Sequence, residues 1–236
     1  MKKKENSTVV WGGKSQSRIL INMLINKSYN SKYLKKKLKL ISIIDPFLKK
    51  PDFKTNIPFT NNKTKFNKYL LKSNSFIVGI GGHYGKARTL ISQEFIKKNL
   101  KPLNIVSEYS YIDETASFGM GVQIMPNVVV HCFSNIGNFC ILNTSSTIDH
   151  ECNIGNGVHI MGGTYLGGRV KIGDYVTIGS NATIFPDVEI KKGAFIGAGA
   201  VVRKNVSENQ IVVGNPAKFI KKNKHYFDLR FFKKNV

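Results

Sequence analysis

Bulky apolar residues recur at every sixth position through the second half of the chain. From Val106 to Val202, seventeen consecutive positions spaced six residues apart are bulky and apolar, although only 42% of the chain is hydrophobic. A second register, four residues after each of these positions, carries small residues from Val122 to Val206. A period of six fits neither an α-helix nor a flat alternating strand. It predicts a solenoid of short strands that meet at regular corners, with both registers pointing inward.

Glycine and cysteine add detail to this repeat. Of the three cysteines, Cys140 and Cys152 fall on the small inward register, so we expect them to pack in the core. Because no CxxC spacing exists, neither a disulfide framework nor a zinc site is indicated. Glycine often follows the bulky residue directly, where we expect it to permit an unusual corner backbone; the positions are Gly119, Gly137, Gly155, Gly167, Gly173, Gly179 and Gly197.

This repeat resembles that of the hexapeptide-repeat acyltransferases, whose fold is a left-handed parallel β-helix with three hexads in each coil. The resemblance implies between five and six coils over residues 106–206, roughly 25 Å long at about 4.8 Å per stacked strand. We expect the β-helix domain to span residues 105–218. A basic aromatic tail, residues 219–236, follows it and is expected to pack on the β-helix or on another subunit.

Strand-like and helix-like segments alternate before the repeat. Runs with strand character are TVVW (8–11), LKLISII (38–44) and SFIVGI (75–80), and runs with helical spacing are RILINMLIN (18–26) and ARTLISQEFIKKNL (87–100). Glycine turns connect several of them. This alternation predicts a small, Rossmann-like parallel α/β domain over residues 1–104.

In such a sheet, ligands bind beyond the carboxyl ends of the strands. The turn after the first strand is not a GxGxxG fingerprint, so a dinucleotide cofactor is poorly supported. Backbone N–H groups at a helix start still suit a phosphate or pyrophosphate, and an aspartate at a strand end can accept hydrogen bonds from a ribose or a base. The alternative is a structural turn with a helix-capping aspartate. The candidate substrate-binding residues here are Gly12, Gly13, Lys14, Ser15, Gln16, Asp45, Gly81 and Gly82.

One histidine in the repeat has a setting suited to proton transfer. His150 lies two residues past inward-facing Ile148, so we expect it at an outward corner, with Asp149 and Glu151 on either side. A neighbouring carboxylate favours the protonated imidazole and makes the ring more basic. Transfer of an acyl group from a thioester to an amine requires such a base. The alternative is a corner histidine that is hydrogen-bonded to a neighbouring coil.

The order of the two domains narrows the resemblance to bacterial sugar acyltransferases of the PglD/NeuD type, over roughly residues 7–220. The run LNTSS-x-I-x-H-E-C, residues 142–152, is similar to the active-site stretch of that family. The resemblance implies that His150 is the general base, that Glu151 raises its basicity and that Asn143 contacts the substrate. The family's glycine turn commonly reads G-x-x-G-H-G, and Ser15, Gln16 and Ser17 replace its second half here.

The resemblance also implies a binding site for acetyl-coenzyme A as the acyl donor and no metal ion. A backbone N–H at Gly168 would bind the thioester oxygen, and Lys218, in the ending VGNPAK, would meet a coenzyme A phosphate. In this family three β-helices form a homotrimer with active sites between subunits, and we expect the same. The implied cofactor contacts are His159, Gly168, Ser180, Ala198 and Lys218.

Charge adds little to this picture. Residues 1–104 hold 23 Lys+Arg against 4 Asp+Glu, but 31 of the 36 basic residues in the chain are lysine. Base readout and bidentate phosphate contacts favour arginine. We interpret the charge as a solvated surface first, a field that concentrates anionic substrates second, and a nucleic-acid interface last. No apolar stretch approaches a membrane span and no signal peptide is evident, so we expect a cytoplasmic protein without membrane insertion.

Together, the residues and the resemblance imply an acetyl-CoA-dependent N-acetyltransferase acting on a nucleotide-linked amino sugar. The sugar is expected to be a 4-amino-4,6-dideoxyhexose, and the product to enter surface glycan synthesis. Three other functions remain open. They are O-acetylation of a sugar such as sialic acid, a metal-dependent hydratase on the same fold, and a non-catalytic solenoid used for assembly.

Overall fold

The computed structural model describes residues 6–34 and 38–224. Its first part is a five-stranded parallel sheet with the order β3-β2-β1-β4-β5. The strands are β1 Ser7–Trp11, β2 Lys39–Ile44, β3 Phe59–Thr60, β4 Ser75–Val78 and β5 Lys101–Pro102. The helices are α1 Ser15–Ile25, α2 Lys63–Lys72 and α3 Gly85–Lys97. The predicted strands and helices are all present, and β3, α2 and β5 are additional.

Both faces of this sheet are covered by helices. On one face, Trp11 packs edge-on against Phe66 of α2 and Phe95 of α3, with ring centroids 5.9 and 5.8 Å apart. On the other face, Ile21 of α1 packs against strand residues Val10 and Ile43. The strand order reverses at β1, which lies between β2 and β4. The loops after β1 and β4 therefore border the crevice in which ligands of such sheets bind.

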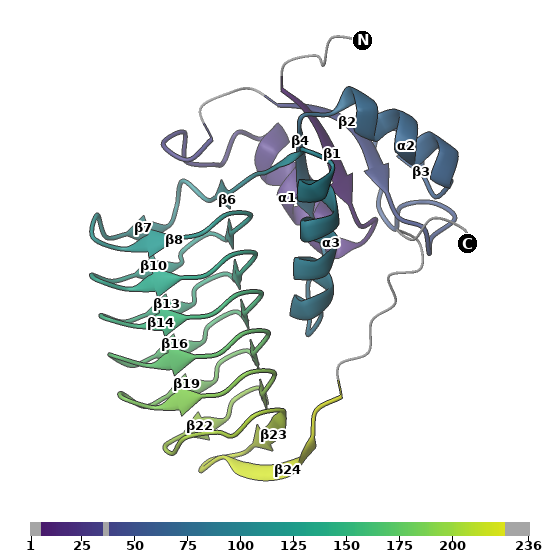
Figure 1. Cartoon of the computed structure of the whole chain (residues 1–236). Coiled ribbons are helices and arrows are strands. Elements are labelled where there is room, and N and C mark those ends of the chain that lie inside the picture. The colour runs from purple at the N-terminus through teal and green to yellow at the C-terminus, as the bar shows by residue number, and fades with distance from the viewer. Residues whose placement is uncertain (1–5, 35–37, 225–236) are drawn as a thin grey trace.

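The hexad repeat folds into a parallel β-helix of two-residue strands (Figure 1). Strands 18 residues apart pair in register, as Thr147 does with Tyr165. The strands of successive coils stack into three sheets, which form the three faces of the β-helix. One sheet contains β6 Ile105–Val106, β9 Gln123–Ile124, β12 Ile141–Leu142, β15 His159–Ile160, β18 Thr177–Ile178, β21 Phe195–Ile196, β23 Gln210–Val213 and β24 Lys218–Lys222.

The other two sheets contain only two-residue strands. One holds β7 Tyr111–Ile112, β10 Val129–Val130, β13 Thr147–Ile148, β16 Tyr165–Leu166, β19 Thr183–Ile184 and β22 Val201–Val202. The other holds β8 Ser117–Phe118, β11 Asn135–Ile136, β14 Asn153–Ile154, β17 Lys171–Ile172 and β20 Glu189–Ile190. Of the predicted C-terminal tail, residues 225–236 lie outside the described residues.

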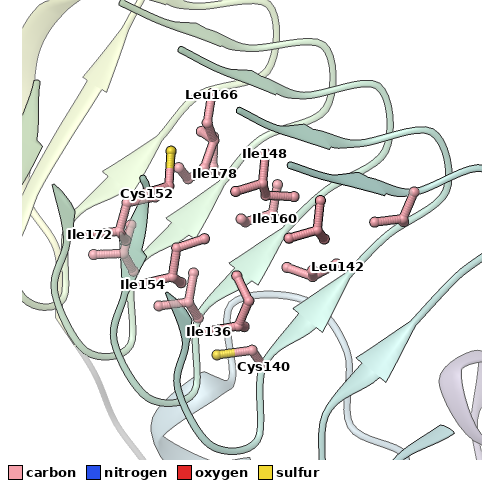
Figure 2. Packing of buried hydrophobic residues seen from close by; sticks show 14 of the residues in the cluster. Ile136, Cys140, Leu142, Ile148, Cys152, Ile154, Ile160, Leu166, Ile172 and Ile178 are labelled. Carbon is pink, nitrogen blue, oxygen red and sulfur yellow. The ribbon is translucent and has the colours of Figure 1, made fainter. Parts of the chain in front are cut away.

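The interior of the β-helix is built as the two registers predict. Figure 2 shows the bulky side chains of successive coils stacked in rows, with Cys140 and Cys152 among them. Both cysteines are fully buried, and burial raises the pKa of the Cys140 thiol to about 12. They are neutral core residues, which confirms the sequence-based interpretation.

The prediction that the glycines directly after the bulky residues permit an unusual corner backbone was wrong. Positive φ angles recur every six residues, but at the third position after the bulky residue, and most residues there are not glycine; Glu151 has φ +59°. The glycines directly after the bulky residues are required for close packing instead. A Cβ at Gly137 would lie 2.6 Å from the backbone of Gly155 in the next coil, and one at Gly173 would lie 2.6 Å from Lys192 N. Neighbouring coils approach too closely there for any side chain.

The three faces of the β-helix differ in what they present outward. The face of β6 to β24 is here called the covered face, because the first domain covers its upper part, where the outward residues Gln123, Ile141, His159 and Thr177 are buried. Its last strand, β24, is exposed. The face of β7 to β22, the Tyr–Val–Thr face, presents Tyr111, Val129, Thr147, Tyr165, Thr183 and Val201. The face of β8 to β20, the polar face, presents Ser117, Asn135, Asn153, Lys171 and Glu189. None of the described helices is long and apolar enough to cross a membrane.

Candidate active site

His150 and Glu151 form an ion-pair geometry at the corner between β13 and β14. His150 Nδ1 lies 2.8 Å from Glu151 Oε2, and both side chains are partly exposed. Hydrogen bonding of Nδ1–H to the carboxylate leaves the lone pair of the neutral ring on Nε2. The carboxylate also stabilises the imidazolium that forms when Nε2 takes up a proton. The pair therefore has the arrangement of a general base with an orienting group.

The free nitrogen of His150 faces Gly168 in the next coil. A Cβ at Gly168 would collide with Nε2 and Cε1 of the imidazole, so only glycine leaves room for the ring in this position. Within residues 6–34 and 38–224, no acceptor lies within hydrogen-bond reach of the Gly168 N–H. A polarised N–H beside a basic nitrogen can hold a developing oxyanion close to the group that removes the proton.

The backbone of this corner is held by the coils on either side. Glu151 N–H donates to Cys132 O at 2.9 Å, and Arg169 N–H donates to His150 O at 2.9 Å. Arg169 in turn makes a bidentate pair with Asp187, at 2.7 and 2.8 Å. The histidine is thus mounted on a rigid stack rather than on a flexible loop, which favours precise placement of its ring.

Only one of the two acidic neighbours contacts the imidazole. The Asp149 side chain instead accepts hydrogen bonds from the Tyr165 hydroxyl at 2.7 Å and from the His150 N–H at 2.8 Å. Burial tends to raise the pKa of this carboxyl, but the two hydrogen bonds, together with attraction to the nearby His150 and His131, outweigh burial and lower it below its ordinary value. The sequence pattern placed acids on both sides of His150, and the structure assigns the contact to Glu151 alone.

The other predicted contacts in the β-helix lie on a different corner. Asn143, Ser180 and Ala198 follow strands of the covered face and line the corner that leads into the Tyr–Val–Thr face. Ser180 and Ala198 are exposed and occupy equivalent places in neighbouring coils. One full face separates this corner from His150 and Gly168. Within a single chain, the structure does not bring the two groups of residues together.

His159 and Lys218 have very different surroundings. The His159 side chain is 3% exposed, beneath the first domain, and its Nδ1 lies 2.8 Å from Gly82 O. Burial, reinforced by the nearby Arg88 charge, lowers the pKa of His159 to about 4, so the ring is neutral. Lys218, at the start of β24, is exposed. Their predicted contacts with a cofactor stay predictions.

The predicted turn of the first domain is tightly built. Gly12 has φ +101°, and a Cβ there would lie 2.7 Å from Gly79 O, so the position requires glycine. Both carboxylate oxygens of Asp45 accept backbone hydrogen bonds at 2.9 Å, from Gly13 and from Phe47. Asp45 thus fixes the turn, as one part of the structural alternative proposed, but it does not cap α1, whose N-cap residue is Lys14. A contact of Asp45 with a ribose or base stays a prediction.

The start of α1 is open to solvent. Lys14 and Ser15 are exposed, and no side chain of the described residues caps the first N–H groups of α1. Free N–H groups at a helix N-terminus are suited to a phosphate. Gln16 is buried, and its amide donates to Gln123 of the β-helix at 2.8 Å. Gly81 and Gly82, in the loop after β4, are half-buried, and a Cβ at Gly81 would lie 3.4 Å from Gln16 Oε1.

Sequence reasoning missed the residues that join the two parts. Arg88 on α3 and Gln123 on β9 are buried and bonded across the junction. Neither residue lies in a sequence motif. The only signal in the sequence was that Arg88 is a charged residue on the apolar face of a helix. Among the described residues, no group of three or more His, Cys, Asp or Glu side chains is arranged to hold a metal ion.

Comparison with known proteins first gives a family match to one part of the β-helix. Residues 151–186 match the family described as bacterial transferase hexapeptide (six repeats). A search of curated protein sequences gives no match for this chain. The segment matched contains Glu151 and His159, and it begins one residue after His150.

Solved structures then match almost the whole chain. PerB from Caulobacter crescentus, determined in complex with CoA and GDP-perosamine, is 21% identical with a TM-score of 0.77, over 94% of this chain and 100% of that one. The acetyltransferase domain of PglB from Neisseria gonorrhoeae, in complex with acetyl coenzyme A, is 22% identical with a TM-score of 0.75, over 91% and 99%. WeeI from Acinetobacter baumannii is 24% identical with a TM-score of 0.76, over 90% and 99%.

These likenesses concern the fold. Over the matched part, the chain has the architecture of these proteins, a parallel α/β domain followed by a left-handed β-helix. They confirm the predicted fold class, and residues 151–186 confirm the hexapeptide repeat of bacterial transferases within it.

Proposed function

We propose that the protein is an acetyl-CoA-dependent N-acetyltransferase that acts on the amino group of a nucleotide-linked amino sugar. The observation that carries this proposal is the placement of His150, with Nδ1 on Glu151 and Nε2 against Gly168. A base and an oxyanion donor side by side serve acyl transfer, and a corner histidine needed only for packing requires neither.

In the proposed reaction, the sugar amine attacks the thioester carbonyl directly. The N–C bond forms as the amine proton passes to His150 Nε2, and Glu151 stabilises the resulting imidazolium. The Gly168 N–H donates to the carbonyl oxygen while it carries negative charge. When the C–S bond breaks, the proton on Nε2 passes to the departing coenzyme A thiolate, which leaves His150 neutral for the next turnover.

The first domain supplies the place for the nucleotide. The open N-terminus of α1 and the loop after β4 border one crevice at the reversal of strand order. Such a crevice suits a diphosphate group. PerB, which shares this architecture, was determined with CoA and GDP-perosamine, and the PglB domain with acetyl coenzyme A. Both observations support an activated sugar as acceptor and a coenzyme A thioester as donor.

The proposal includes a trimer with active sites between subunits. The Tyr–Val–Thr face is the face of the β-helix that has neither charged outward residues nor the first domain over it. If three chains place this face around a common axis, the corner with His150 in one chain adjoins the corner with Asn143, Ser180 and Ala198 in the next. The two groups of predicted contacts, which one chain keeps apart, then line a single site.

A thiol-release assay tests the proposal. The full-length protein is incubated with acetyl-CoA and a panel of UDP-, dTDP- and GDP-linked 4-amino sugars, and free coenzyme A is measured. We expect turnover with one nucleotide-linked amine and an N-acetylated product by NMR. Release of coenzyme A only with hydroxylated sugars that lack the amine would contradict N-acylation and favour O-acetylation. No release with any acceptor would contradict the proposed reaction class.

A further inference from the structure

Arg88 is a fully buried arginine at the junction of the two domains. Figure 1 shows α3, which carries Arg88, running alongside the coils of the β-helix. The Arg88 side chain is 1% exposed. Its Nε donates to Phe139 O at 2.7 Å, and its terminal nitrogens donate to Ile80 O at 2.9 Å, to Gly157 O at 3.1 Å and to Val158 O at 3.3 Å.

Every hydrogen bond of this guanidinium goes to a backbone carbonyl. In the described part of the chain, no carboxylate pairs with Arg88. Burial lowers the pKa of Arg88 to about 10, so the group still carries its charge at neutral pH. A buried charge without a counter-ion is costly unless its hydrogen bonds are satisfied. The guanidinium therefore holds three separate stretches of backbone in one place.

Two more buried side chains hold the same loop. Gln123 Nε2 donates to Val78 O at 2.7 Å, and His159 Nδ1 donates to Gly82 O at 2.8 Å. Together with the bond from Arg88 to Ile80, alternate carbonyls at 78, 80 and 82 are each bound by a different side chain. The end of β4 and the loop after it are thus held at three points, directly by Gln123 and His159 of the β-helix and, through Arg88 of α3, by the bonds of its guanidinium to the β-helix backbone.

This arrangement links the predicted nucleotide crevice to the catalytic coil. Residues 80–82 border that crevice, whereas Gly157 and Val158 lie in the same coil as His150. We infer that Arg88 is a positioning residue: it fixes the crevice loop against the β-helix of its own chain, and in the proposed trimer it thereby sets where the amine of a nucleotide-linked acceptor meets the base of the adjoining chain. The inference rests on the proposed function, and it assigns Arg88 no contact with the substrate.

The first test does not depend on catalysis. Hydrogen–deuterium exchange of the full-length protein is compared between wild type and Arg88→Met, which keeps the length of the stem but removes every donor. We expect faster exchange of amides in residues 79–84 and unchanged exchange in the coils that Arg88 does not contact. The control is Lys97→Met, which also introduces a methionine in α3 but replaces an exposed lysine. If Arg88→Met does not fold, Arg88→Lys replaces it, since it keeps the charge but not the fork of donors.

Kinetics supply the second test. In the variant that folds, we expect kcat/KM for the nucleotide-linked amine to fall roughly tenfold to a hundredfold, because small misplacements of a reacting group are costly. The KM for acetyl-CoA should stay as in wild type. Lys97→Met should match wild type in both.

Each outcome decides the inference. Unchanged exchange of residues 79–84 in a folded Arg88 variant overturns it, as does an equal loss of affinity for both substrates, which indicates a general effect on stability. If wild type itself acetylates no amino sugar, the proposed function fails. Loop-specific exchange then decides only whether Arg88 holds the loop, and the positioning of an acceptor falls with the function.

Discussion

The buried histidine at the domain junction makes the stability of this protein depend on pH. His159 is neutral in the folded state, where burial and the Arg88 charge lower its pKa to about 4, against 6.5 in an unfolded chain. Between these two values the unfolded chain binds the extra proton, so stability falls as the pH drops from about 6.5 to about 4. The loss approaches roughly 3 kcal/mol, at about 1.4 kcal/mol per pKa unit.

His159→Gln isolates this effect, because a glutamine amide can still donate to Gly82 O but does not titrate. Urea unfolding is followed at several pH values between 7 and 4.5, at one protein concentration, by the fluorescence of the single tryptophan, Trp11. Carboxylates and the exposed histidines contribute equally to the pH dependence of stability in wild type and in the variant. We therefore expect wild type to lose more stability than the variant as the pH falls. Parallel curves for the two proteins would refute a buried neutral imidazole at this position.

Three further predictions concern the site and the core. Gly168→Ala pushes the added methyl group into the His150 ring, so activity should fall by roughly a hundredfold with an unchanged circular dichroism spectrum. Normal turnover would show that the ring does not need this space. Ile160→Ala empties a fully buried site of the β-helix and should cost about 2–5 kcal/mol in urea unfolding; a cost under about 1 kcal/mol would contradict the packing described. Tyr165→Phe removes the hydrogen bond that helps to lower the pKa of Asp149, so NMR titration should show that pKa raised, and no change would argue against the bond.

The β-helix was predictable because its sequence repeat is short and regular. Each inward position follows from its place in the hexad, and every coil has 18 residues, so that equivalent residues of neighbouring coils pair in register, as Ile148 does with Leu166. The prediction of the first domain was less complete. Helix α2 buries only Phe66 and Leu70 among four lysines, and β3 has two residues, so neither gives a clear periodic signal.

The candidate site divides in the same way. His150 and Glu151 are adjacent in sequence, so their contact follows from a local corner. The contact of Gly168 with the ring follows from the 18-residue period. The links among Arg88, Gln123 and His159 join residues far apart in the chain through backbone carbonyls, which leave no pattern in the sequence. The glycines were misinterpreted for a related reason, since close approach of two coils and a positive φ give the same residue type.

The most direct test of the account is the rate of thiol release by His150→Ala with the nucleotide-linked amine that wild type accepts. The control is His131→Ala, an exposed histidine one coil away that the proposed reaction does not use. Loss of a general base typically costs 10²–10⁴-fold, so we predict a fall in kcat of roughly that size for His150→Ala, with the KM for acetyl-CoA little changed and His131→Ala near wild type. A His150→Ala protein that turns over at the wild-type rate would contradict the central claim, because the proton of the amine would then leave by another route.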